Sequence, residues 1–177
     1  MRVLPVLSAA FISLAALHAF ADTPATPPPG TLAPGMLKTL LENMGYEAKE
    51  YSGNLYDITD SRAGMSLHVS VILSGDNSCL WFYANLPSVA SADKIPASVM
   101  RDMLLANFTI GPSHFSLFTQ SDGTIVPRLS RALDNHGITP ALIRPVIENM
   151  FVNLVQYEPV WNTNKWPGAT TAPATAR

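Results

Sequence analysis

The chain has 177 residues, of which 47% are hydrophobic and 14% are charged, and its formal net charge is −2. This length and composition predict one globular domain. Because no block of lysine or arginine stands out, the charge pattern excludes a nucleic-acid-binding protein that relies on a basic surface. It also argues against an anionic membrane surface as a partner.

The first 21 residues have the features of a cleavable export signal. Arg2 supplies a positive charge, residues 3–17 are uncharged and largely apolar, and Ala19 and Ala21 are small residues at the cleavage positions. An uncleaved anchor helix is the alternative, but a spanning helix needs about 20 apolar residues. We therefore predict a signal peptide over residues 1–21, and a periplasmic or secreted protein with 10 basic against 13 acidic residues and a net charge of −3.

The two ends of the mature chain are poor in charge and rich in proline, alanine and threonine. Residues 22–34 are predicted to be an extended, Pro-rich linker, and residues 162–177 a flexible C-terminal tail. The predicted domain therefore covers residues 35–161. A chain of that size buries well over half of its surface and supports one hydrophobic core without disulfides.

The first predicted elements are a short helix and a weak strand region. In residues 36–44, apolar side chains recur on one helical face, and Gly45 suits the left-handed end of that helix. Residues 46–58 favour a strand, but residues 52–54 interrupt the pattern with a bend or bulge.

A clearer pair of strands follows. Apolar and polar side chains alternate along residues 65–73, with Ile72 as the exception, and residues 79–86 carry a second apolar row. A five-residue link joins the two runs, so we predict an antiparallel hairpin. Trp81 and Tyr83 lie on the face opposite the apolar row of their strand.

Two further helices are predicted. One begins near Pro96 and ends at Gly111. Its apolar stripe consists of Val99, Met100, Met103, Leu104 and Phe108. The other begins with Thr139 as N-cap and Pro140 at the first helical position, and Pro159 closes it.

A second hairpin lies between these helices. It joins residues 113–120 to residues 124–129 through an Asp-Gly turn, and Pro127 indicates an edge strand because proline donates no ladder hydrogen bond. The fold class is therefore α+β: an antiparallel sheet of about five strands with three helices, in the order α-β-β-β-α-β-β-α.

Four segments in this order resemble a known family. They are residues 40–46 (Leu-Leu-Glu-Asn-Met-Gly-Tyr), residues 103–108 (Met-Leu-Leu-Ala-Asn-Phe), residues 115–117 with Asp122-Gly123, and Thr139-Pro140 before Leu142. As an ordered set they resemble the YbjN-like domains within the type III secretion chaperone-like (CesT-type) fold. The resemblance implies a small, dimer-forming module that binds protein segments or serves regulation. It implies no catalytic residues.

The residue types that carry catalysis or bind metals are scattered. His68, His114 and His136 have no second histidine or cysteine at ligand spacing, so we predict no metal site and no cofactor. No nucleophile elbow or phosphate loop is present in the sequence. Cys79, the one cysteine, lies in an apolar run and is predicted to be a buried, inert thiol.

Two surfaces are candidates for binding. If helices cover one sheet face only, Trp81 and Tyr83 form an exposed aromatic patch; otherwise a helix or loop covers them. Met100, Met103 and Leu104 are a candidate self-association surface, with core packing as the alternative.

The leading functional hypothesis is an exported, non-enzymatic module, regulatory or chaperone-like, that binds a protein segment or a second copy of itself through the sheet face or a strand edge. The alternatives are a carrier of a small apolar ligand held between sheet and helices, and, less favoured, a hydrolase. A hydrolase would require His68 or His114 to converge with an acidic residue in one cleft.

Overall fold

The computed structural model describes residues 30–33 and 35–167. The predicted signal peptide, most of the predicted linker and the last ten residues of the predicted tail lie outside this part of the chain. The elements are α1 (Met36–Asn43), β1 (Ala48–Ser52), β2 (Leu55–Arg62), β3 (Met65–Leu73), β4 (Cys79–Asn85), η1 (Ala92–Lys94), α2 (Ala97–Ala106), β5 (His114–Thr119), β6 (Ile125–Asp134), α3 (Pro140–Gln156), α4 (Glu158–Trp161) and η2 (Thr163–Lys165). Within the described residues, no helix combines the length and apolar character needed to cross a membrane.

The fold is α+β, as predicted, and its antiparallel sheet has six strands in the order β1-β2-β3-β4-β6-β5. The predicted weak strand region is two strands, because Ser52 pairs with Leu55 across a tight turn. Gly53 takes a positive φ of 54° in that turn, which glycine adopts without strain. In β1 only Ala48 is buried, so this strand carries too little alternation to be separated from its neighbour by sequence alone.

Strand β6 lies inside the sheet, between β4 and β5, although Pro127 predicts an edge position. The position tolerates proline for a local reason. The last pair between β4 and β6 joins Asn85 to Arg128, so the missing N–H of Pro127 falls just beyond the end of that ladder. The Pro127 carbonyl still accepts a 2.9 Å hydrogen bond from the backbone N–H of Leu86.

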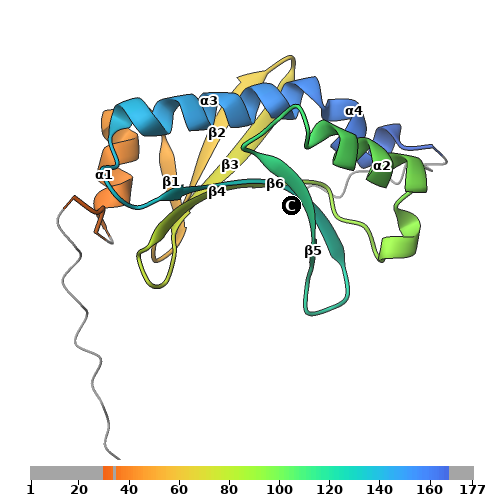
Figure 1. The fold of residues 1–177 in the computed structure, drawn as a ribbon, viewed down its shortest axis with the longest axis horizontal. Coiled ribbons are helices and arrows are strands. Elements are labelled where there is room, and N and C mark those ends of the chain that lie inside the picture. Colours follow the sequence, from red (N-terminus) through yellow and green to blue (C-terminus); the bar gives the residue numbers. More distant parts are fainter. Residues whose placement is uncertain (1–29, 34, 168–177) are drawn as a thin grey trace, which may run out of the picture.

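The helices lie on one face of the curved sheet, and Figure 1 shows the opposite, concave face without a helical layer. The long helix α3 crosses this face of the sheet, and its buried side chains pack against the strands. Thr139 caps this helix by accepting from the N–H of Leu142, as predicted. Core side chains that are fully buried come from β2 (Ile58), β3 (Val69), β4 (Leu80, Phe82), β6 (Leu129) and α3 (Ile143, Ile147, Met150, Phe151).

The predicted apolar stripe of α2 differs from the observed one. Its buried residues are Val99, Met103 and Ala106, which recur at helical spacing, whereas Leu104 lies on the outer side and is 66% exposed. Phe108 follows the end of the helix and is 89% exposed. Including Met103 in the candidate self-association surface was therefore wrong, because this side chain belongs to the core.

The folded unit extends beyond residues 35–161 at both ends. Leu32 is buried, and the side chain of Asn135 bonds both its backbone N–H and its carbonyl, each at 2.9 Å. At the other end Trp166 is buried and donates its indole N–H to the carbonyl of Val160 at 3.0 Å. The proline-, alanine- and threonine-rich composition of both ends obscures these single apolar anchors.

Candidate interaction face

We call the helix-free side of the sheet the open face. Residues that pair directly across antiparallel strands point to the same side, so the register identifies its members. One row crosses all six strands and consists of Lys49, Asp57, Ser70, Tyr83, Ser130 and His114, in the spatial order of the strands. The row carries polar and charged groups around one aromatic ring, which distinguishes it from the apolar rows under the helices.

Aromatic side chains stand beside this row. Trp81 lies one step along β4, opposite Ile72 of β3, and is 40% exposed, while Tyr83 is half-buried. Phe118 of β5 is also exposed on this face. The helices therefore leave the predicted pair of Trp81 and Tyr83 uncovered, and Phe118 enlarges the aromatic surface beyond what the sequence indicated.

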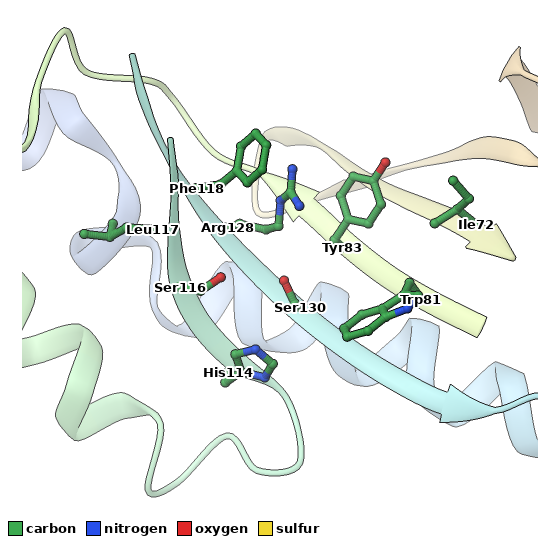
Figure 2. Close-up of a pocket in the computed structure, with 9 residues that line it drawn as sticks. All are labelled: Ile72, Trp81, Tyr83, His114, Ser116, Leu117, Phe118, Arg128 and Ser130. Atoms are coloured by element: carbon green, nitrogen blue, oxygen red, sulfur yellow. The ribbon is translucent and has the colours of Figure 1, made fainter. Parts of the chain in front are cut away.

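Two adjoining hollows shape the open face. The first has a volume of about 360 Å³ and is lined by Ile72, Trp81, Tyr83, His114, Ser116, Leu117, Phe118, Arg128 and Ser130 (Figure 2). The second, of about 430 Å³, is lined by Tyr51, Leu55, Asp57, His68, Ser70, Tyr83 and Asn85. Tyr83 contributes to both hollows, so together they form one continuous concave surface across β1 to β5.

Arg128 is the charged residue that lines the first hollow between Phe118 and Tyr83. Its guanidinium carbon lies 4.6 Å from the centroid of the Tyr83 ring and 4.5 Å from that of Phe118. Its Nε donates a 2.8 Å hydrogen bond to Oδ1 of Asn85. Figure 2 shows the guanidinium held between the two rings. Three contacts from two neighbouring strands, β4 and β5, thus hold the guanidinium beside the aromatic side chains of the open face.

The electrostatics of the two hollows differ in sign. Burial raises the pKa of Tyr83, the positive charge of Arg128 opposes that rise and the negative charge of Asp57 adds to it. Asp57 itself accepts a hydrogen bond from the hydroxyl of Ser70. The first hollow therefore carries a cation, the second carries an anion, and the neutral phenol of Tyr83 separates them.

The open face brings His68 and Asp57 to the same hollow, which is the convergence that a hydrolase requires. Their contacts do not form a catalytic relay. Nδ1 of His68 lies 3.1 Å from the hydroxyl of Thr59, and the Ser70 hydroxyl is bonded to Asp57. In a nucleophilic relay the imidazole stands between the serine and the acid. The described residues also contain no cluster of three or more side chains suited to a metal ion.

The second candidate surface is the outer side of α2. Met100 and Leu104 are exposed there together with Leu105. The prediction that Cys79 is buried is wrong: it begins β4 and is only partly buried, because it alternates with the buried Leu80 and lies on the same side of the strand as Trp81. No α2 residue lines either hollow of the open face, so we treat the α2 surface as a separate question.

Sequence reasoning missed Arg128 and Phe118. The parity of the predicted hairpin places His114, Ser116 and Phe118 on one side, and this alternation was available as a signal. No such signal placed Arg128 beside Tyr83. That contact depends on the pairing of β6 with β4, and 42 to 54 residues, including α2, separate the paired positions in the sequence.

No protein-family model matches the chain, and no curated protein shows significant similarity to it. A solved structure of an uncharacterized protein from Methanothermobacter thermautotrophicus aligns over 74% of this chain and 97% of its own length. The TM-score of that alignment is 0.42 and the sequence identity is 10%. The resemblance to YbjN-like domains stays a prediction from sequence.

Proposed function

We propose that the protein is an exported, non-enzymatic module, regulatory or chaperone-like, that binds a protein segment on its open face. The observation that carries this proposal is the concave, helix-free surface on which Trp81, Tyr83 and Arg128 stand together. Tryptophan, tyrosine and arginine are the residue types that dominate binding energy at protein interfaces. The resemblance to YbjN-like domains, stated above, agrees with this function.

The open face is favoured over the space between sheet and helices. Phe82, Met150 and Phe151 fill that space and are fully buried. The two hollows that combine aromatic and charged groups lie on the other side of the sheet. A carrier of a small apolar ligand would need room under the helices, so the proposal places the partner on the open face instead.

Site-specific photocrosslinking tests this function. A photoreactive amino acid at Ile72, which lines the first hollow, should crosslink to a protein partner in cells that export the chain. The matched control is Leu142, which is exposed on α3 on the helix side of the molecule. Trp81→Ala should lower the crosslink yield at Ile72, because the indole is a large, exposed side chain that lines the same hollow.

Equal crosslinking from Ile72 and Leu142, or no crosslinked protein from Ile72, would contradict binding on the open face. The export proposal has its own measurement. Mass spectrometry of the protein from a periplasmic or culture-medium fraction should give a chain that begins at Asp22. A full-length chain retained in the cytoplasm would overturn it.

A further inference from the structure

We propose that Arg128 is the receptor for a carboxylate of the bound segment, which rests on the proposed function above and adds the chemical class of the partner. The segment would carry an aspartate or glutamate for Arg128 and a large apolar side chain for Trp81. Four observations lead to this inference: the immobilised guanidinium, its missing counterion, the charge of its surroundings and its separation from Trp81.

The guanidinium is held in place before any ligand binds. The rings of Tyr83 and Phe118 lie on either side of it, and Asn85 binds its Nε. These contacts use one of its five N–H donors and leave the four on the two Nη atoms. A planar fork that is already oriented loses little entropy when it binds a carboxylate with two parallel hydrogen bonds.

Within the described part of the chain this cation has no counterion. Among the residues that the structure describes, every ion pair is formed by a lysine or arginine other than Arg128, and no acidic side chain lies within ion-pair distance of Arg128. By contrast, Arg62 on the same sheet contacts both Asp60 and Glu148 at 2.6 Å. A half-buried guanidinium that two rings shield but no anion neutralises is suited to bind an anion from outside.

The surroundings favour a carboxylate over a phosphate. Arg128 is the one lysine or arginine that lines the first hollow, and the adjoining hollow contains Asp57. A phosphate carries up to two negative charges and is normally bound by several cationic groups or backbone N–H groups. A single bidentate contact beside apolar Trp81 and Ile72 suits a monoanionic carboxylate next to an apolar side chain.

The register gives the spacing of the two contacts. Arg128 stands opposite Asn85 on β4, and Trp81 precedes Asn85 by four residues on the same face of that strand. At ~3.3 Å per residue the backbone positions of Asn85 and Trp81 are therefore about 13 Å apart. An extended segment lying along β4 would place its acidic and its apolar side chain four residues apart, both directed toward the sheet.

Selection of displayed 12-residue peptides on the purified mature protein provides the probe. We expect selected peptides to contain an acidic residue and an aromatic or large aliphatic residue four positions apart. In synthetic versions, changing that acid to Gln or Asn should weaken binding roughly tenfold or more, as for a lost charge-assisted contact. Arg128→Gln should weaken binding of the acidic peptide by the same factor and leave binding of the neutral peptide unchanged.

The acid-to-amide change in the peptide leaves the protein intact, so the test holds even if Arg128→Gln is poorly folded. If Trp81→Ala weakens binding while removing the acid has no effect, the carboxylate inference fails and the proposed function stands. If no peptide is selected, or neither variant of the open face alters binding, both fail. Competition by inorganic phosphate that exceeds competition by acetate would assign the site to phosphate and overturn the inference.

Discussion

The two faces of strand β4 show how differently one strand is used. Leu80, Phe82 and Ala84 point toward the helices and are almost entirely buried. Trp81 and Tyr83 alternate with them and face the helix-free side, where Trp81 retains 40% of its surface. Size and aromaticity alone therefore do not mark a core residue. The covered face provides stability, and the open face keeps large side chains available for contact.

Truncating one aromatic residue on each face should give the largest difference in stability. Phe82→Ala should lower the free energy of unfolding by about 3–5 kcal/mol, since it leaves a cavity between the sheet and α3. Urea denaturation followed by circular dichroism measures the change. Trp81→Ala is the matched control, and it should cost well under half as much because water already reaches that side.

Equal losses of stability from Phe82→Ala and Trp81→Ala would mean that the open face is covered in solution. That result would remove the basis for binding there. A small loss for Trp81→Ala combined with lower crosslinking from Ile72 would instead separate the two roles, with stability assigned to one face and binding to the other.

The comparison extends to polar residues of one type. Asn135 is buried and holds the backbone of Leu32 and the carbonyl of Asn77 through three hydrogen bonds of 2.8–2.9 Å. Asn135→Ala should cost about 1–3 kcal/mol, because buried backbone groups lose their partners. Asn85→Ala on the open face removes one exposed contact to Arg128 and should cost less than 1 kcal/mol.

Hydrogen exchange locates this effect. In Asn135→Ala the backbone N–H of Leu32 should lose its protection while the centre of β4 keeps its own. Unchanged protection at Leu32 would show that burial of the Leu32 side chain, and not the bond to Asn135, holds this part of the chain in place.

The sequence predicted the layers of the fold better than it predicted the site. Alternation along β3 and β4 and the cap at Thr139 are local signals, and the structure confirms the elements that they indicated. The limits at Leu32 and Trp166 were missed because each is marked by one buried apolar residue within a stretch rich in proline, alanine and threonine. Arg128 was missed because its neighbours are brought together only by the pairing of β6 with β4.

A third prediction concerns the ion pair that joins the sheet to α3. Glu148 accepts from Arg62 at 2.6 Å and from the Tyr46 hydroxyl at 3.1 Å. The bond from Arg62 lowers the pKa of Glu148 below 4.5, while burial and the bond to Glu148 raise the pKa of Tyr46 to about 12. Because the folded pKa of Glu148 is depressed, its contribution is complete above the unfolded value and is lost as the pH falls below about 4.5.

Glu148→Gln should therefore cost a few tenths to about 1 kcal/mol at neutral pH, a range set by the partial exposure of the pair. Its effect should shrink as the pH falls toward 3, which urea titrations at several pH values measure. The control is Glu42→Gln, which removes an exposed pair with Lys38 and should change stability by less than 0.5 kcal/mol, as estimated for surface pairs. A Glu148→Gln effect that does not depend on pH would show that the contact acts through packing.

The smallest effect on stability is expected on the outer side of α2, at Leu104. Its neighbour in sequence, Met103, is buried on the opposite side of the helix. Leu104→Ser should change the free energy of unfolding by no more than about 0.5 kcal/mol, since the side chain is 66% exposed. Met103→Ser serves as the contrast, because the same change at a buried position removes core contacts.

Sedimentation of the wild-type chain and of the Leu104→Ser variant tests self-association through the α2 surface. If the wild type is a dimer that Leu104→Ser dissociates, the α2 surface joins two copies. If both sediment as monomers, self-association through α2 is refuted.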